Sequence, residues 1–264
     1  MLEIINVCKT FNAGTINEKK ALNGLNLHLK PGDFVTVIGG NGAGKSTMLN
    51  SVAGVYPVDE GQILIDGEDV THLPEFKRAR VIGRVFQDPM MGTAATMQIE
   101  ENLALAMRRG KKRGLRTGIT KQEREDYRER LKILDLGLED RMTAKVGLLS
   151  GGQRQALTLL MATLQKPKLL LLDEHTAALD PKTAAKVLEA TQRIVERDNL
   201  TTLMITHNMR DAIAYGNRLV MMYNGHIVVD VSGDEKKQLT VNQLLALFSK
   251  VSGSDEANDK LLLG

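Results

Sequence analysis

The sequence lacks the features that mark disulfide-rich, zinc-binding or membrane-spanning chains. Cys8 is the single cysteine among 264 residues, which excludes an internal disulfide and a zinc site built from cysteines. The longest apolar runs, such as 169–172 and 219–222, are far shorter than the roughly 20 residues that a membrane-spanning helix needs. Its start, Met1 to Ile4, lacks the basic and then apolar order of a secretory signal. We therefore expect a chain that stays where it is made and does not cross a membrane.

An excess of one charge is also missing. The 35 basic residues are offset by 32 acidic ones, which leaves a net charge of +3. Because nucleic-acid-binding surfaces carry a marked positive excess, we expect no nucleic acid partner. What is present is a hydrophobic content of 42%, enough for the core of one large domain or two modest ones.

Short apolar segments predict a parallel α/β core. Strands rich in branched residues are expected at 34–38, 80–86, 168–172 and 201–206. A helical pattern at 182–197 separates the last two strands. The first strand enters a glycine loop and then a helix, which is the order of a nucleotide-binding βα unit.

Segments outside this core follow other patterns. Strands at 2–8 and 25–30 are expected to form a half-exposed antiparallel sheet, and Asn224-Gly225 predicts a hairpin.

A stretch with little strand signal interrupts the core. Helical periodicity at 98–108 and 121–136 predicts an inserted helical subdomain. We expect one domain over residues 1–250, with the helical subdomain at about 90–165, and a polar tail over 251–264.

The segment after the strand at 34–38 fits the pattern of a phosphate-binding loop. Its glycines let successive N–H groups point at phosphate oxygens, and the following helix adds partial positive charge. Lys45 would reach the β- and γ-phosphates, and the Ser46 hydroxyl would bind Mg²⁺. A glycine turn without a ligand is the alternative, which the strand, loop and helix order disfavours. The loop consists of Gly39, Gly40, Asn41, Gly42, Ala43, Gly44, Lys45, Ser46 and Thr47.

Two carboxylates follow the apolar run 169–172. Ligands of parallel sheets gather at the carboxyl ends of the strands, so Asp173 is a candidate to hold Mg²⁺ through its water shell. Glu174 is the candidate general base that polarises the attacking water. The alternatives are a helix cap or solvated strand end for one acid, and a structural carboxylate for Glu174.

The segment Leu149 to Gln155, with the sequence LSGGQRQ, opens a helix expected to run to about Gln165. Ser150 stands where an N-cap belongs, and such a helix start attracts anions. A capped helix alone explains Ser150 but not the consecutive Gly151 and Gly152, because glycine is a poor helix former.

Together, the phosphate loop, the acidic strand end and LSGGQRQ resemble the nucleotide-binding subunits of ABC transporters, over about residues 2–232. The resemblance implies an α/β fold: a P-loop NTPase core of mainly parallel sheet with helices, an N-terminal antiparallel β subdomain and an inserted α-helical subdomain. It implies ATP hydrolysis with ATP and Mg²⁺ as cofactors. It also implies that Ser150, Gly152 and Gln153 face the γ-phosphate bound by a second copy, so that head-to-tail subunits enclose two ATP molecules.

The same resemblance suggests roles for residues that would be weak signals alone. Gln87 would touch Mg²⁺ and the attacking water, His207 would be the switch histidine, and 178–180 would be the D-loop. Phe11 would stack on adenine, although tyrosine is commoner at that place. The alternatives are an ordinary polar loop residue for Gln87 and a structural role for His207.

Partners follow from the same resemblance. It implies separate membrane permease subunits, a second nucleotide-binding subunit as a homodimer, a substrate-binding protein in the full system, and a peripheral place at the cytoplasmic face of the membrane. The helical insert and the loop 89–97 are the candidate docking surface. The basic stretch 108–116 is either a solvated linker or a contact with anionic lipid headgroups.

Import fits a stand-alone chain with a helical insert, and 148–157 and 173–180 resemble the ATPases of tryptophan/tyrosine-type bacterial uptake systems. His175 departs from the proline that usually follows the acidic pair. An ABC-type ATPase acting on nucleic acid or ribosomes is the alternative function, and a small-molecule P-loop kinase is a third. The sequence leaves the cargo open.

Overall fold

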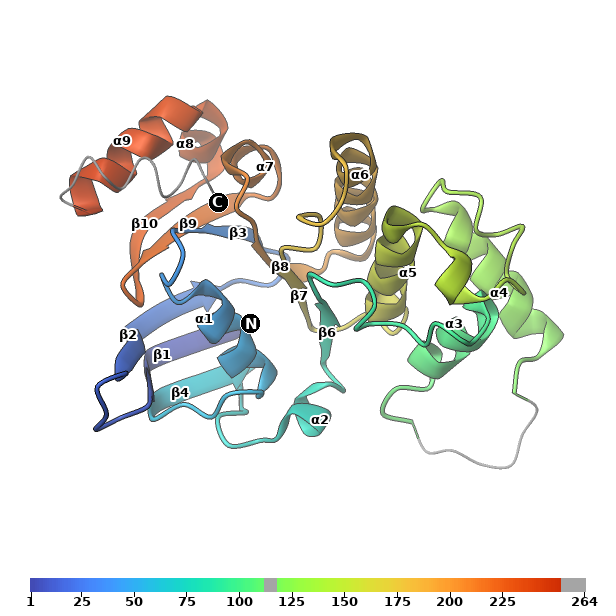
Figure 1. The fold of residues 1–264 in the computed structure, drawn as a ribbon, viewed down its shortest axis with the longest axis horizontal. Helices are drawn as coiled ribbons and strands as arrows, with labels where there is room; N and C mark the ends of the chain where they lie inside the picture. The colour runs from blue at the N-terminus through green and yellow to red at the C-terminus, as the bar shows by residue number, and fades with distance from the viewer. Residues whose placement is uncertain (112–117, 253–264) are drawn as a thin grey trace. The chain divides into compact units, whose positions relative to one another are not determined.

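The computed structural model describes residues 1–111 and 118–252 (Figure 1). The chain forms two compact units. Unit 1 comprises Met1–Arg78 and the chain from Thr201 onward, and unit 2 comprises Ala79–Leu200. No described helix is long and apolar enough to span a membrane.

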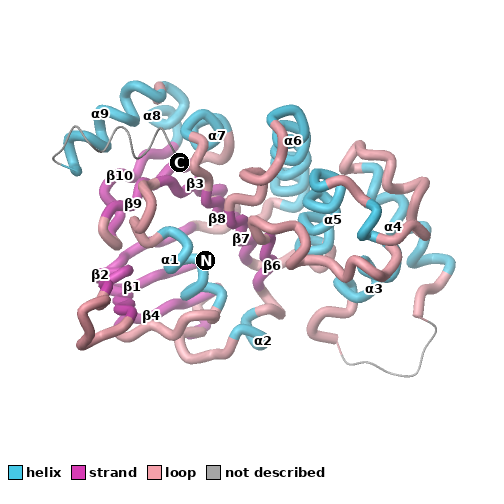
Figure 2. The backbone as a smooth tube through the Cα atoms, viewed as in Figure 1, coloured by secondary structure: helices cyan, strands magenta, loops and turns pink. Residues whose placement is uncertain are grey.

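The first sheet of unit 1 is antiparallel, as the sequence predicts. It contains β1 (Leu2–Phe11), β2 (Lys19–Leu29), β4 (Glu60–Ile65) and β5 (Glu68–Asp69), in the order β2-β1-β4-β5. Figure 2 shows the first three of these strands side by side. β2 begins at Lys19, well before the predicted start, because its polar first residues pair with the end of β1. Because these first residues are polar and exposed, the sequence has no alternating apolar pattern there.

A second set of strands in unit 1 surrounds β3 (Phe34–Ile38), whose five residues are all buried. β3 is parallel to β8 (Thr201–Ile205) and to β9 (Arg218–Tyr223), and β9 pairs antiparallel with β10 (His226–Ser232). The predicted hairpin is confirmed: Asn224 and Gly225, between β9 and β10, have φ values of 46° and 78°. Positive φ at both central residues is what a type I′ turn requires.

Five helices complete the described part of unit 1. The longest, α9, was not predicted; its Leu244 and Phe248 are buried in an apolar cluster with Ile38 and Met221. Such an amphipathic helix is stabilised by burying one face. The five are α1 (Lys45–Ala53), α2 (Glu75–Arg78), α7 (Met209–Ala214), α8 (Gly233–Gln238) and α9 (Val241–Ser252).

Unit 2 combines a parallel strand pair with helices. β6 (Ile82–Val85) pairs with β7 (Leu169–Asp173), and the predicted helical segments are present. A Cβ at Gly83 would lie 2.6 Å from the Ala162 carbonyl oxygen, so glycine in β6 lets the helix α5 approach closely. The helices are α3 (Ile99–Met107), α4 (Lys121–Lys132), α5 (Gly151–Thr163) and α6 (Pro181–Asp198), with the 3-10 turn η1 (Val146–Leu148).

An ion pair connects α3 to α4. The guanidinium of Arg124 donates to the Glu100 carboxylate at 2.7 and 2.9 Å, and this bidentate geometry lowers the pKa of Glu100. Within the predicted basic stretch 108–116, residues 112–116 lie outside the described part of the chain. The predicted boundaries at 1–250, about 90–165 and 251–264 stay a prediction.

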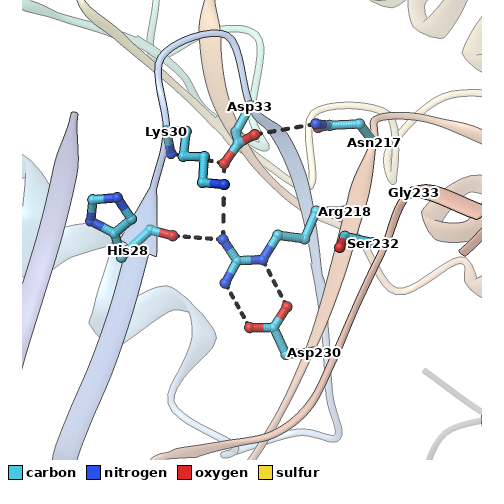
Figure 3. A pocket seen from close by; sticks show the side chains of 8 residues that line it. All are labelled: His28, Lys30, Asp33, Asn217, Arg218, Asp230, Ser232 and Gly233. Atoms are coloured by element: carbon cyan, nitrogen blue, oxygen red, sulfur yellow. Dashed lines mark hydrogen bonds and ion pairs between the residues drawn. The ribbon is translucent and has the colours of Figure 1, made fainter. Parts of the chain in front are cut away.

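Arg218 links several strands of unit 1 at the amino end of β9. Its guanidinium donates to Asp230 at 2.7 and 2.6 Å and to the His28 carbonyl at 2.6 Å, and Asp33 lies 3.9 Å away (Figure 3). These groups line a pocket of about 610 Å³. Because the Arg218 donors are engaged by these groups, we interpret the pocket as a structural ion-pair network.

We predict that Arg218→Ala lowers the free energy of unfolding by about 1–2 kcal/mol, because hydrogen bonds to charged groups are lost in a partly buried place. The matched control is Lys237→Ala, whose ion pair with Asp234 is exposed and should contribute within about 0.5 kcal/mol. Urea unfolding measures both; equal effects would contradict the prediction.

Candidate functional site

The phosphate loop of unit 1 packs closely against the backbone of two other segments, at Met222 and at Ala21. A Cβ at Gly39 (φ 150°) would lie 2.3 Å from the Met222 carbonyl oxygen, and one at Gly44 (φ 102°) would lie 2.5 Å from that of Ala21. The Gly225 N–H of the hairpin also donates to the Ala43 carbonyl at 3.0 Å. Only glycine fits both the positive φ and the approach at positions 39 and 44.

A buried ammonium group lies at the start of α1, beside the loop. The Lys45 ammonium is buried and donates to the carbonyls of Gly39 at 2.7 Å and Gly40 at 3.2 Å. The N-cap, Gly44, offers its helix no side-chain cap among the described residues, and Ser46 is exposed in the first turn. Uncapped N–H groups beside an ammonium form a cradle that fits a phosphate group.

Lys19 is a second cation beside the loop, which the sequence reasoning missed. A Cβ at Gly42 would lie 3.0 Å from the Lys19 Nζ, and Lys19 is paired with Phe11 across β1 and β2. The Phe11 ring contacts the Tyr56 ring edge-on, with centroids 5.3 Å apart. This pairing brings Phe11 to the same side as the loop, while its contact with adenine stays a prediction. Lys19 was missed because a single lysine after a polar loop matches no sequence motif.

His207 lies at the same edge as the loop. In the parallel pairing of β3 and β8, Val37 is opposite Ile205, and the Thr206 N–H donates to the Val37 carbonyl at 3.1 Å. Gly39 follows Val37 by two residues, and His207 follows Ile205 by two residues, so both lie past the carboxyl ends of neighbouring strands. The half-buried His207 is followed by Asn208, whose side chain caps α7.

Unit 2 gathers the acidic pair and Gln87 at one strand edge. Val85 of β6 is opposite Leu172 of β7, so the residues that follow both strands leave the pair at its carboxyl end. Asp173 and Glu174 are half-buried there and Gln87 is exposed. Carboxylate and amide oxygens are ligands that Mg²⁺ prefers, so Asp173 and Gln87 fit that ion.

Arg84 is a further charged group at this edge. Its Nη2 lies 3.6 Å from the Asp173 carboxylate, and its guanidinium lies 4.5 Å from the centre of the Phe86 ring. The only signal was one arginine inside an otherwise apolar strand, which the sequence reasoning passed over.

The residues after Asp173 take an unusual path. Glu174 has a φ of 46°, in the left-handed region, and its carbonyl accepts the Ala177 N–H at 3.0 Å. His175 is 2% exposed, and its Nε2 lies 3.1 Å from the Thr191 Oγ1 of α6. Burial lowers the pKa of His175 to about 4, so the imidazole is neutral at pH 7.

The LSGGQRQ segment forms the start of α5 as predicted. The Gln153 N–H donates to the Ser150 Oγ at 3.3 Å, and the Ser150 N–H donates to the Gln153 Oε1 at 3.2 Å. This capping box leaves the Ser150 hydroxyl proton available to an acceptor, and it engages the Gln153 amide oxygen.

Packing explains one of the two glycines that a capped helix alone left unexplained. A Cβ at Gly152 would lie 1.9 Å from the Thr183 Cγ2, so any side chain there would force the Thr183 side chain of α6 to move. At Gly151 a Cβ would meet Leu179 at an ordinary 3.4 Å. Contact with α6, rather than helix capping, therefore gives Gly152 a structural reason.

Helix α5 also holds the segment that carries Gln87. The Gln155 amide donates to the Phe86 carbonyl at 2.9 Å, and Arg154 donates to the Met90 sulfur. A Cβ at Gly92 would lie 2.4 Å from the Thr158 Cγ2, so the loop passes close to the same helix. One helix therefore positions both the LSGGQRQ segment and the segment after β6.

A family model described as ABC transporter matches residues 22–177. The chain belongs to this family. A tyrosine transport ATP-binding protein of Clostridioides difficile is 44% identical over 248 residues, which are 94% of this chain and 98% of that protein. A phosphonates import ATP-binding protein of Bacillus anthracis is 35% identical, covering 87% and 88% of the two chains.

Solved structures agree with the family. A dimeric ATP-binding cassette, in a post-hydrolysis state with ADP and Pi, is 31% identical with a TM-score of 0.75, covering 88% of this chain and 98% of that one. The fold is that of an ABC ATPase, with the antiparallel and helical parts that the sequence predicts. The chain is the ATP-binding subunit of an ABC transporter, and it is an ATPase.

Acid should destabilise this ABC ATPase through His175. Its pKa is about 4 in the folded chain and 6.5 as the ordinary value, so the unfolded state binds more protons between these pH values. Stability then falls as the pH drops below about 6.5, by roughly 2 kcal/mol at about pH 5. His175→Gln, which cannot titrate, should lose that much less in urea unfolding over the same range. Identical pH dependence of the two proteins would refute this cause.

Proposed function

We propose that two copies of this ABC ATPase bind two Mg-ATP head to tail and power substrate import through separate permease subunits. The observation that carries the proposal is the pair of anion-suited helix starts in one chain. The uncapped start of α1 has the Lys45 ammonium beside it, and the start of α5 has the Ser150 hydroxyl available. Each copy thus has one surface for the phosphates that it binds and another for a neighbour's γ-phosphate.

Each residue would act according to its place. The loop from Gly39 to Thr47 would bind the phosphates through its N–H groups and through Lys45. Asp173, through water, with the Ser46 hydroxyl and the Gln87 amide oxygen would hold Mg²⁺, which supplies charge neutralisation on the β- and γ-phosphates. Phe11 would contact adenine.

Glu174 would accept a hydrogen bond from the attacking water and take up its proton as the general base. His207, at the edge of β8 beside the loop, would donate a hydrogen bond to the γ-phosphate. Ser150, Gly152 and Gln153 would complete the site from the partner copy, Ser150 by its hydroxyl. Loss of the γ-phosphate removes these bonds, so hydrolysis would open the dimer.

The membrane partner would dock on the loop 89–97 and the helical insert near 90–165. Met90 and Met91 are 54% and 69% exposed, and flexible methionine side chains suit an adaptable interface. The chain would then sit peripherally at the cytoplasmic face of the membrane. The likeness to a tyrosine transport ATP-binding protein favours an amino acid as cargo, delivered by a substrate-binding protein.

Glu174→Gln tests the chemistry. We expect ATP binding to be retained, turnover to fall by about 100-fold or more because the base is lost, and an ATP-dependent dimer to accumulate on a sizing column. Glu189→Gln, at an exposed position of α6, is the matched control and should behave like the unaltered chain. Normal turnover by Glu174→Gln would exclude its proposed role.

Met91→Glu tests the docking surface. A charge there should abolish co-purification with membrane subunits from detergent-solubilised membranes. The ATPase rate of the isolated subunit should stay within about twofold, since the Met91 side chain is exposed and is not one of the candidate site residues. Ile16→Glu, at a fully exposed position, is the control and should co-purify normally. A complex without integral membrane subunits would favour the alternative ABC-type ATPase acting on nucleic acid or ribosomes.

A further inference from the structure

His175 occupies a buried place directly after the proposed base. Its side chain reaches from the end of β7 to the middle of α6, where Thr191 is 1% exposed. The Thr191 Oγ1 has one hydrogen, which it donates to the Val187 carbonyl at 2.8 Å. It can therefore only accept from the imidazole, so the hydrogen-bond network assigns the proton of the neutral ring to Nε2.

The neighbouring Glu174 needs such support. A glutamate with a φ of 46° is in a strained backbone conformation, which persists only where its surroundings impose it. On the carboxyl side, the path is held by the Ala177 N–H bond to Glu174 and by the buried His175 ring. Because Glu174 and His175 share a peptide unit, a displaced imidazole would rotate the backbone that aims the glutamate carboxylate.

The residue type also matters at this position. Proline, which usually follows the acidic pair in this family, would drive the preceding residue toward extended conformations and away from the left-handed one. Histidine leaves the φ of Glu174 unrestricted and provides a donor that proline lacks. The hydrogen bond from His175 to α6 can therefore restrict the loop beside Glu174, as the proline ring restricts it in relatives that have proline at this position.

We propose that His175 is a positioning residue for Glu174, acting through its Nε2–H hydrogen bond to Thr191. This inference rests on the proposed role of Glu174 as the general base. It goes beyond that role, because two buried residues outside the proposed catalytic groups would then influence the hydrolysis rate. If His175 only filled space in the core, its imidazole proton would be dispensable for turnover.

Two pairs of variants separate these roles. His175→Leu fills similar space without a donor, whereas His175→Gln retains an N–H near the Nε2 position. Thr191→Val keeps the shape without the hydroxyl, whereas Thr191→Ser keeps the hydroxyl. We expect His175→Leu and Thr191→Val to lower kcat by about 10- to 100-fold, with KM for ATP within about twofold, because a small displacement of a catalytic group is enough.

The rescue variants His175→Gln and Thr191→Ser should stay within about threefold of the unaltered kcat. Thermal melting of all four shows which are folded, and the isosteric Thr191→Val keeps the test decisive if His175→Leu does not fold. A double-mutant cycle adds a readout that loss of packing would not produce: in a Glu174→Gln background, Thr191→Val should have no further effect on residual turnover.

Three results would overturn the inference. If Glu174→Gln loses turnover but His175→Leu and Thr191→Val match the rescue variants, His175 does not position Glu174, and the proposed function stands. If Thr191→Val slows residual turnover equally in the Glu174→Gln background, its role is structural only. If Glu174→Gln turns over normally, the proposed base and the inference that rests on it both fail.

Discussion

Close backbone contact around the phosphate loop is the constraint on which the nucleotide half-site of unit 1 depends. At Gly39 and Gly44 the loop passes so near to Met222 and Ala21 that no side chain fits. This packing holds the loop against the β9–β10 hairpin, sets the start of α1 and directs Lys45 to the loop carbonyls. Because the protein's own contacts hold the loop in shape, binding has less chain to order.

Unit 2 uses the same principle around α5. Gly83 lets α5 approach β6, and Gly152 lets it approach α6. Through Gln155, the helix that begins with the capped Ser150 also holds the backbone next to Gln87. In the proposed function, the segment that docks on the permease and the segment that faces a partner's ATP are thus held by one rigid helix. A displacement at Met90 would be transmitted to Ser150 through few intermediate contacts.

Much of the fold and of the candidate site was predictable because the signals are local. The strand, loop and helix around Lys45, the apolar strand before Asp173, and the Asn224-Gly225 turn each depend on neighbouring residues and backbone geometry. What was missed depends on distant residues. Arg84 is notable only once β6 pairs with β7, and Lys19 only once β2 lies beside the loop.

The sequence by itself determined the family, the ATPase chemistry and most of the candidate site residues, since these follow from residue types at short spacings. Only the tertiary structure decided what a side chain at Gly152 would meet and why His175 can stand beside Glu174. Both answers lie in α6, at Thr183 and Thr191, beyond the motifs themselves. A side chain buried against another element takes its role from that neighbour, and no local pattern specifies which neighbour it will meet.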